Sequence, residues 1–253
     1  MSRTVKGCGS IRYNKEQRNM KPILIFDTET TGIGEDDTVC QIAYLLVDPK
    51  TLEVVESYET LIDAKKDPHP RAFAVHGIKR EDYIGKPTLE EFYEDKFKHA
   101  LDKCGALSGH NLKFDLRMLK RVVQPEHQVI DTLVLARALY PTWRNHKLES
   151  VSANLKLPKF KAHDAMGDIL TCLEFLKAVT VEHNIENLYD MYSFIGRSLK
   201  SVKSEANNLN LNATNLAAFG CEDDNIDWDR GYRGTISNIW IIQPSNGDFA
   251  FEC

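Results

Sequence analysis

Two acidic residues lie two positions apart after a short apolar run. The run from Ile23 to Phe26 predicts a buried strand, and Asp27 and Glu29 come at its end. Side chains at positions i and i+2 of a strand point to the same face, so both carboxylates would share one side of a sheet. A divalent cation bound there would offset the repulsion between two partly desolvated charges. Capping of the strand end is an equally simple interpretation, because Asp-x-Glu is common by chance.

Two further acidic residues lie on predicted helices. Asp115 falls in the first turn of a helix that follows Gly109-His110-Asn111, and Asp168 lies on a helix that begins just after His163. A carboxylate near a helix N-terminus is favoured by the helix dipole alone. A single histidine before a helix is often an ordinary surface residue. Each segment is therefore weak support for a site when it is taken alone.

The combination is more specific than its parts. Four carboxylates from three separate segments provide the oxygen ligands that hard cations such as Mg²⁺ or Mn²⁺ prefer. Two such ions about 3.5–4 Å apart can stabilise the attacking and leaving oxygens of an in-line phosphoryl displacement. Histidine is a natural base for the attacking water near neutral pH, and His163 is placed to serve as one. The set therefore predicts metal-dependent phosphodiester hydrolysis.

Three segments resemble the exonuclease motifs of the DEDDh family, which includes the epsilon proofreading subunit of bacterial DNA polymerase III and ribonuclease T. They are Phe26-Asp27-Thr28-Glu29-Thr30-Thr31-Gly32, Gly109-His110-Asn111 through Asp115, and His163 through Asp168. The stretch from Phe73 to Ile78 is similar to a further family element near the substrate. The resemblance covers roughly residues 23–178.

The resemblance implies a role for each site residue. Asp27, Glu29 and Asp168 would hold the catalytic ion, and Asp27 would bridge to a second ion that Asp115 supports through water. His163 would be the general base, whereas a tyrosine there would indicate the sister subfamily. The product would be a 5′-mononucleotide released from a 3′ end. Four residues would contact the terminal nucleotide: Thr30, His76, Asn111 and Phe114.

The elements that must position these residues alternate along the chain. After the first strand, residues 41–48 and 54–62 predict two more strands in a meander, and short strands are expected at 106–108 and 129–130. Helices are expected at 71–76, 89–101, 112–123, 132–140, 147–155 and 164–183. This order predicts an α/β fold with a mixed sheet. The resemblance implies a ribonuclease-H-like fold, with a mixed five-stranded sheet flanked by helices.

Two residues near these motifs have simple structural interpretations. Asp131 is typical of the family's Asp-Thr-Leu segment, but it is interpreted here as a helix cap. Phe114 falls on an apolar helical face, so core packing is the alternative to a substrate contact.

Three regions are expected along the chain: a basic N-terminal arm (1–20), the exonuclease domain (21–202) and a C-terminal appendage (203–253). The appendage begins with an Asn-rich linker, shows no evident internal repeat, and carries five acidic residues between Glu222 and Asp229. Residues 231–242 could form a small hairpin. The acidity favours a role for the appendage in packing, partner binding or dimerisation over catalysis.

Bulk properties narrow the class of protein. No apolar run reaches the length of a membrane span, and the N-terminus lacks the apolar core of a secretory signal. None of the six cysteines has zinc-site spacing, so free thiols in the cytoplasm are expected. The formal net charge of −5 is unusual for a protein that coats long duplex nucleic acid.

The leading hypothesis is an exonuclease that trims single-stranded DNA 3′ ends in repair, proofreading or phage-type nucleic-acid metabolism, alone, as a homodimer or with a replication or repair partner. An RNA or short-oligonucleotide exonuclease would use the same site, since nothing in the motifs reads the 2′-hydroxyl. A hydrolase of small or cyclic signalling nucleotides is a further alternative. A non-catalytic nucleic-acid-binding scaffold is disfavoured because all five active-site residues are present.

Overall fold

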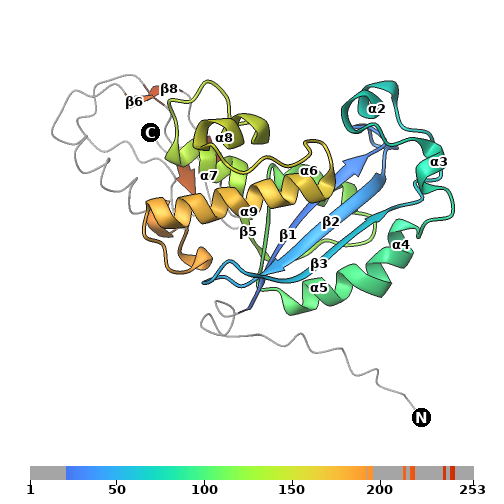
Figure 1. Cartoon of the computed structure of the whole chain (residues 1–253), viewed down its shortest axis with the longest axis horizontal. Helices are drawn as coiled ribbons and strands as arrows, with labels where there is room; N and C mark the ends of the chain where they lie inside the picture. Colours follow the sequence, from blue (N-terminus) through green and yellow to red (C-terminus); the bar gives the residue numbers. More distant parts are fainter. Residues whose placement is uncertain are drawn as a thin grey trace, which may run out of the picture.

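The computed structural model describes residues 21–191, residues 193–195 and four short strands between 213 and 242 (Figure 1). The basic arm expected at 1–20 lies outside the described residues, as do the Asn-rich linker at 207–212 and the acidic run at 222–229.

A five-stranded mixed sheet forms the centre of the molecule, in the order β3-β2-β1-β4-β5. The strands β1 (Ile23–Thr30), β2 (Val39–Val47) and β3 (Val54–Leu61) form an antiparallel meander. The strands β4 (Ala106–Gly109) and β5 (Gln128–Asp131) continue the sheet in parallel with β1. The predicted mixed sheet is therefore confirmed, with β1 at its centre.

Helices cover both faces of the sheet. One layer contains α7 (Thr132–Leu139), α8 (Leu148–Leu155) and α9 (Ala165–Glu182), and Figure 1 shows α9 lying across β1 and β2. The other layer contains α4 (Leu89–Phe92), the π-helical turn η1 (Tyr93–Phe97), α5 (Lys98–Lys103) and α6 (Leu112–Leu119). Three short elements complete this part: α2 (Pro70–His76), α3 (Arg80–Tyr83) and the 3₁₀ turn η2 (Leu188–Asp190).

The central strand contributes to two separate cores because its side chains alternate. Ile23 and Ile25 pack in the core beneath α9, whereas Leu24 and Phe26 pack in the core beneath α4 to α6. All four side chains are fully buried. The same alternation continues along β1, so the side chains of Asp27 and Glu29 lie on the face that α9 covers.

Most helix boundaries follow local signals in the sequence. Thr88 and Glu91 form a reciprocal capping box at the start of α4, and Gly77 ends α2 with a φ of 74°. The helix expected over 89–101 is interrupted by η1. The helix expected over 112–123 ends at Leu119, six residues before Pro125. The proline therefore does not define the end of α6.

The C-terminal strands contradict the hairpin expected at residues 231–242. β8 (Ile236–Ser237) pairs in parallel with β6 (Ala213–Thr214), and β9 (Trp240–Ile242) pairs in parallel with β7 (Ala217–Phe219). A hairpin requires adjacent antiparallel strands, so the prediction was wrong. The glycines at 231 and 234 are turn signals in the sequence, but such local signals do not reveal the pairing partner of a strand.

Two expectations about chain class can be examined in the described residues. Within them, no helix is both long enough and apolar enough to cross a membrane. Three of the six cysteines are described there, namely Cys40, Cys104 and Cys172, and all three are free and buried. Burial raises the pKa of the Cys40 and Cys104 thiols to about 12, so these residues behave as small apolar side chains.

Candidate active site

Asp27 and Glu29 lie within β1, on the face that α9 covers. The strand continues to Thr30, so the two carboxylates sit inside the strand and not beyond its end, as the sequence had suggested. Glu29 pairs with Gln41 of β2, and the register shifts between Glu29 and Thr30. The strand β2 pairs with β1 through the whole segment that carries both carboxylates, whereas β4 pairs with β1 only from Ile23 to Ile25.

The start of α9 brings Asp168 and His163 to the same place. Asp164 caps the helix by accepting a hydrogen bond from the Gly167 amide at 3.4 Å, and Asp168 follows in the first turn. Oxygen or nitrogen atoms of Glu29, His163 and Asp168 all lie within 4.8 Å of one another. The structure thus brings together three of the five residues predicted from the sequence, from two elements far apart in the chain.

Asp115 approaches from the other helix layer. It is buried in the first turn of α6, and its Oδ1 accepts hydrogen bonds from the Thr28 amide at 3.0 Å and the Thr28 hydroxyl at 2.6 Å. Thr28 lies between Asp27 and Glu29, with its side chain on the opposite face of β1. It therefore links Asp115 to the strand that carries the other carboxylates. Sequence reasoning did not assign Thr28 a role, because only the fold brings α6 beside it.

The turn before α6 depends on Gly109 and Asp131. A Cβ at Gly109 would lie 2.8 Å from the carbonyl oxygen of Phe26, so only glycine allows β4 to pass this close to β1. The Asp131 carboxylate accepts hydrogen bonds from the Leu133 amide and also from the amides of Asn111 and Leu112. The expectation that Asp131 caps α7 is confirmed, and the same carboxylate also anchors the start of α6.

All four carboxyl groups have a raised pKa. Burial is the largest cause for each, and it lifts the pKa of Glu29 to about 8, that of Asp115 to about 7 and that of Asp168 to about 6. The pKa of Asp27 is also well above its usual value, because of burial and of repulsion by Asp115, Asp168 and Glu29. The hydrogen bonds from Thr28 oppose the rise at Asp115.

This charge pattern fits a divalent cation. Near neutral pH, four acidic groups share a small partly buried volume, which favours either bound protons or a compensating positive charge. Their oxygen atoms are the ligands that Mg²⁺ and Mn²⁺ prefer. Glu29 and Asp168 come from the two sides of the site, and Asp27 interacts electrostatically with both. The donor set therefore suits a hard cation held between β1 and α9.

His163 has an unusual backbone and an acidic partner. Its φ is +56°, a conformation that few non-glycine residues adopt. Its Nε2 lies 3.0 Å from Oε1 of Glu149, in the first turn of α8, and both side chains are about half exposed. Glu149 was not predicted from the sequence, because an acidic residue in the first turn of a helix carries no distinctive signal.

Gln41 is a second residue that the sequence did not reveal. It is buried in β2 opposite Glu29, and its Oε1 accepts a hydrogen bond from the Ala165 amide at 3.2 Å. Its Nε2 donates to Glu59 at 2.8 Å and, at 3.4 Å, to the capping residue Asp164. Gln41 thereby fastens the start of α9 to the sheet next to the carboxylates.

Two of the four expected nucleotide contacts are engaged inside the protein. His76 is buried, its Nδ1 accepts from the Ile78 amide at 3.0 Å, and its Nε2 lies 3.2 Å from the Thr30 carbonyl oxygen. Nε2 must then carry the proton and donate to that carbonyl. The Thr30 hydroxyl donates to the Gly32 carbonyl at 2.7 Å. Both side chains shape the backbone around Glu29.

The other two expected contacts are more open. Asn111 precedes α6 with a φ of 67° and is exposed. Phe114 is partly buried, packs against the core beneath α6, and has the Arg117 guanidinium 5.2 Å from its ring centroid. The core-packing interpretation of Phe114 therefore accounts for one part of the ring, while the remaining part stays accessible.

Replacement of Gly167 by alanine is expected to destabilise the start of α9. A Cβ at this position would collide with the Lys161 carbonyl oxygen, a backbone atom that cannot move without displacing the loop that carries His163. Overpacking of this kind costs about 1–3 kcal/mol. Thermal unfolding of Gly167→Ala should show a lower midpoint than Lys159→Ala, a control in an exposed part of the same loop. Equal midpoints would contradict the close approach.

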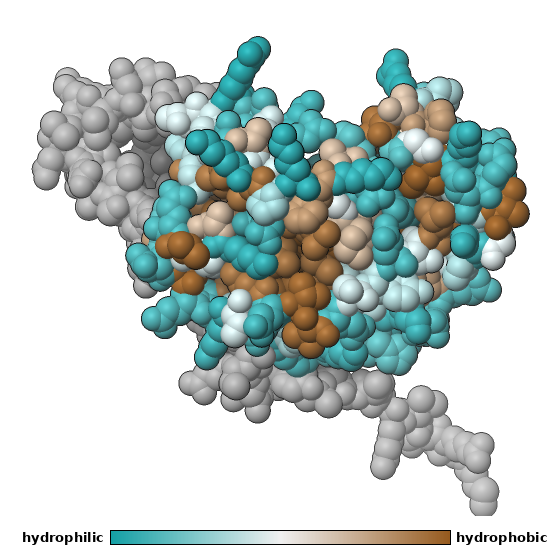
Figure 2. Space-filling view, viewed as in Figure 1, coloured by the Kyte–Doolittle hydropathy of each residue, from teal (hydrophilic) through white to brown (hydrophobic). Residues whose placement is uncertain are grey.

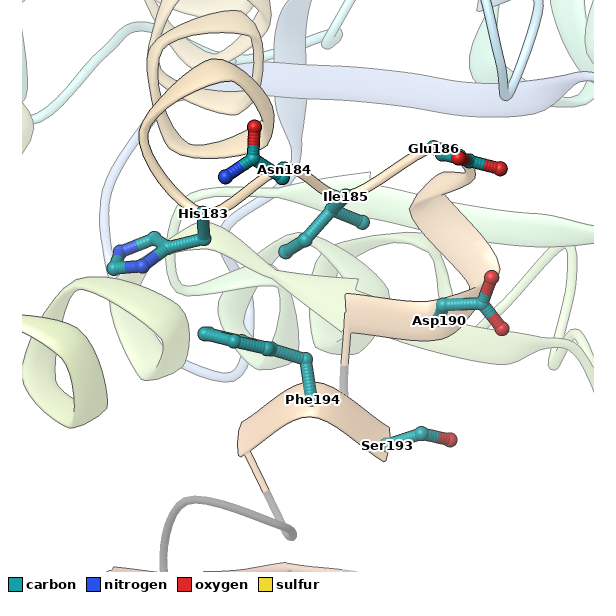
Figure 3. Close-up of a pocket in the computed structure, with 7 residues that line it drawn as sticks. All are labelled: His183, Asn184, Ile185, Glu186, Asp190, Ser193 and Phe194. Atoms are coloured by element: carbon teal, nitrogen blue, oxygen red, sulfur yellow. The ribbon is translucent and has the colours of Figure 1, made fainter.

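A cavity of about 510 Å³ lies away from this site (Figure 3). Its lining includes His183 and Phe194, whose ring centroids are 5.0 Å apart. His183 follows the last turn of α9, whereas Asp168 lies in the first turn. At 1.5 Å per residue, the two positions are roughly 22 Å apart along the helix. The cavity is therefore distinct from the carboxylate site.

Comparison with known proteins identifies the family. The family model described as Exonuclease, of the ribonuclease T type, matches residues 24–176, which is more than half of the chain. The epsilon subunit of DNA polymerase III from Treponema pallidum is 29% identical over 171 residues, covering 64% of this chain and 78% of that protein. A PolC-type DNA polymerase III from Latilactobacillus sakei is 32% identical over 162 residues, but the matched part is only 10% of its length.

Solved structures show the same fold. Exonuclease X in complex with 5′-overhanging duplex DNA aligns with a TM-score of 0.56 and 23% identity, over 69% of this chain and 99% of that one. Escherichia coli exonuclease I, in a complex with single-stranded DNA, aligns with a TM-score of 0.57 and 21% identity, over 73% of this chain and 45% of that one.

A second family model, described as a pectate-lyase-like beta helix domain, matches residues 209–253. It covers less than half of the chain, whereas the exonuclease match spans the sheet, the helices and all five candidate residues. The expected ribonuclease-H-like fold is confirmed. The chain belongs to the exonuclease family of the ribonuclease T type, the DEDD 3′→5′ exonucleases, hydrolases that depend on divalent metal ions.

Proposed function

We propose that this exonuclease removes 5′-mononucleotides from the 3′ ends of single-stranded DNA with two Mg²⁺ or Mn²⁺ ions. The observation that carries the proposal is the convergence of Glu29, His163 and Asp168 within 4.8 Å, with Asp27 on the same strand. Two bound ions would stabilise the charge that develops on the attacking and leaving oxygens. We assign the exonuclease domain to residues 21–202, which extends the matched range of 24–176 at both ends.

The candidate residues have three proposed roles: metal binding, proton transfer and contact with the terminal nucleotide. Asp27, Glu29 and Asp168 would hold the catalytic ion, and Asp115, buried and oriented by Thr28, would support the second. His163 accepts the proton of the attacking water, and its side chain is half exposed beside the carboxylates. Asn111 and Phe114 contact the terminal nucleotide from α6. His76 and Thr30 act through the backbone that they brace.

Three exposed apolar residues lie on segments near candidate site residues in the sequence and suit unpaired bases. Ile33, Phe73 and Phe160 are exposed, on the loop after β1, on α2 and on the loop before α9. Each of these segments carries or adjoins a candidate site residue. Figure 2 shows apolar residues gathered in patches on an otherwise hydrophilic face. Bases stack on aromatic rings without regard to sequence, so this arrangement favours single-stranded substrates.

A time course with 5′-labelled oligonucleotides tests the proposal. The wild-type protein should shorten single-stranded DNA from the 3′ end as a ladder, faster than duplex DNA, and EDTA should stop the reaction. RNA of the same sequence is the alternative substrate and is tested beside it. Faster loss of RNA would replace DNA with RNA in the proposal. Cleavage of a circular single strand would contradict an exonuclease that requires a 3′ end.

Replacement of Glu149 by glutamine is expected to lower kcat about tenfold at neutral pH. The side chain keeps its size but loses the charge that holds the His163 imidazole at 3.0 Å. KM for the oligonucleotide should change little, because Glu149 is placed to act through the base and not on the substrate. Initial rates at saturating Mn²⁺ measure both constants. Glu186→Gln, an exposed carboxylate beyond the far end of α9, is the matched control. Identical kcat values for Glu149→Gln and Glu186→Gln would show that Glu149 has no part in catalysis.

A further inference from the structure

The four C-terminal strands are related by a single sequence offset. Five Cα pairs are formed between β6 and β8 and between β7 and β9, and every pair joins residues 23 positions apart. The pairs are Ala213 with Ile236, Thr214 with Ser237, Ala217 with Trp240, Ala218 with Ile241, and Phe219 with Ile242. Two separate two-stranded sheets therefore share the same displacement along the chain.

A constant offset is the pattern of a chain that winds in coils. In a hairpin the sum of paired residue numbers stays constant, whereas here the difference stays constant. A parallel pair also needs a connection of a dozen residues or more, which a 23-residue step provides. Both strand pairs break at equivalent places, because two residues separate β6 from β7 and two separate β8 from β9. One coil thus carries two strands that lie in register on the two strands of the next coil.

The sequence repeats at the same interval beyond the strands. Asn215-Leu216 corresponds to Asn238-Ile239, and Ile226-Asp227-Trp228 corresponds to Phe249-Ala250-Phe251. The repeat is short and only two copies are present, so it is not evident without the register. It lies wholly inside residues 209–253, which match the beta helix family model. The sequence similarity at this interval is consistent with the strand register.

We propose that the four strands β6 to β9 belong to two successive coils of a parallel β-solenoid with a 23-residue period. The chain then joins two different folds, and the appendage is a second module whose architecture does not extend the exonuclease sheet. In a solenoid each repeat contacts mainly its neighbours, so the strands of the second coil would depend on those of the first. The family match indicates a beta helix, and the register gives its coil length and the residues that stack.

Paired cysteines in the full-length chain test the register. Neighbouring strands lie about 4.7–4.9 Å apart, and a disulfide needs Cα atoms within about 7 Å. In a background with Cys8, Cys221 and Cys253 replaced by serine, two matched variants carry Ala213→Cys with Ile236→Cys and Ala218→Cys with Ile241→Cys. Two crossed variants combine the same four substitutions as Ala213→Cys with Ile241→Cys and Ala218→Cys with Ile236→Cys. Mild oxidation and peptide mass spectrometry then report which disulfides form.

Both matched pairs should form intramolecular disulfides in severalfold higher yield than the crossed pairs. Because the four substitutions are the same in both sets, a general loss of folding would lower the yield equally. Exonuclease activity measured in parallel shows whether the rest of the chain is intact, since none of the four residues lies in the catalytic site. Equal yields in matched and crossed variants, or failure of both matched pairs, would overturn the coil register.

Discussion

Replacement of Asp27 by asparagine is expected to lower the rate of 3′-end hydrolysis by about 10³-fold or more. Asp27 lies on the central strand and interacts electrostatically with Asp115, Asp168 and Glu29. Its negative charge therefore contributes to the charge of the whole carboxylate cluster. An amide keeps the shape of the side chain but removes the negative charge that the cations require. Initial rates in Mg²⁺ and Mn²⁺ with labelled single-stranded DNA measure the effect.

The same substitution is expected to stabilise the metal-free protein. The pKa of Asp27 is raised by burial and by three acidic neighbours, which means that the folded state disfavours its negative charge. Removing that charge should increase the free energy of unfolding by about 1 kcal/mol or more, and so raise the midpoint by about 2–4 °C. Thermal unfolding in EDTA at pH 8 measures this gain. A variant that is inactive and more stable is the expected combination.

Asp36→Asn is the matched control for both measurements. Asp36 is an exposed carboxylate in the loop after β1, so its replacement should change neither the rate nor the midpoint appreciably. If Asp27→Asn retained wild-type activity, the proposed catalytic site would be wrong. If it were inactive and also less stable in EDTA, the carboxylate cluster would not be a source of electrostatic strain.

The stabilisation by divalent cations should increase between about pH 5 and pH 8. The pKa values of Asp168, Asp115 and Glu29 are raised to about 6, 7 and 8 in the folded protein. A carboxyl group with a raised pKa binds its proton more tightly in the folded state than in the unfolded chain. Between the pKa of such a group in the unfolded chain and its pKa in the folded protein, the folded state carries more protons than the unfolded state. The stability of the metal-free protein therefore falls as pH rises through this range.

A bound cation replaces those protons, and its contribution is therefore largest where the protons have been lost. At a concentration near 100 times Kd, the cation adds about 2.7 kcal/mol to the free energy of unfolding. That gain corresponds to about 5–10 °C for a domain of this size. The difference in midpoint between Mn²⁺ and EDTA, measured at pH 5, 6, 7 and 8, should grow with pH. The double variant Asp27→Asn, Asp168→Asn should show a small difference at every pH, and an equally large one would contradict the assignment.

The sheet and most helices could be predicted because their signals are local. The buried run at β1, the alternating pattern of β3 and the cap at Thr88 each depend on a few neighbouring residues. The carboxylates proposed for the site could be selected from the sequence, because the chemistry of a divalent cation restricts the residue types that bind it, and the structure brings Glu29 and Asp168 together. Their exact place within β1 was not foreseen, since apolar character ends at Phe26 while strand pairing continues to Thr30.

The supporting residues could not be predicted, because their partners are distant in the sequence. Thr28 meets Asp115 across 87 positions, and Gln41 meets the Ala165 amide across 124. Glu149 resembles any acidic residue in the first turn of a helix until the fold places it beside His163. The prediction of a C-terminal hairpin was wrong for the same physical reason. The glycines at 231 and 234 are a local signal in the sequence, whereas pairing with residues 213–219 depends on a distant segment.

The positive φ of His163 has a consequence for how the site could be modified. Glycine adopts this backbone conformation without strain, and the imidazole that it would remove stands half in solvent. His163→Gly would therefore leave the loop intact and open a passage from solution to the carboxylates. Free imidazole could enter that passage and substitute for the missing ring. The proposed site would then separate into a charged frame carried by β1, α6 and α9 and an exchangeable proton acceptor supplied from outside the protein.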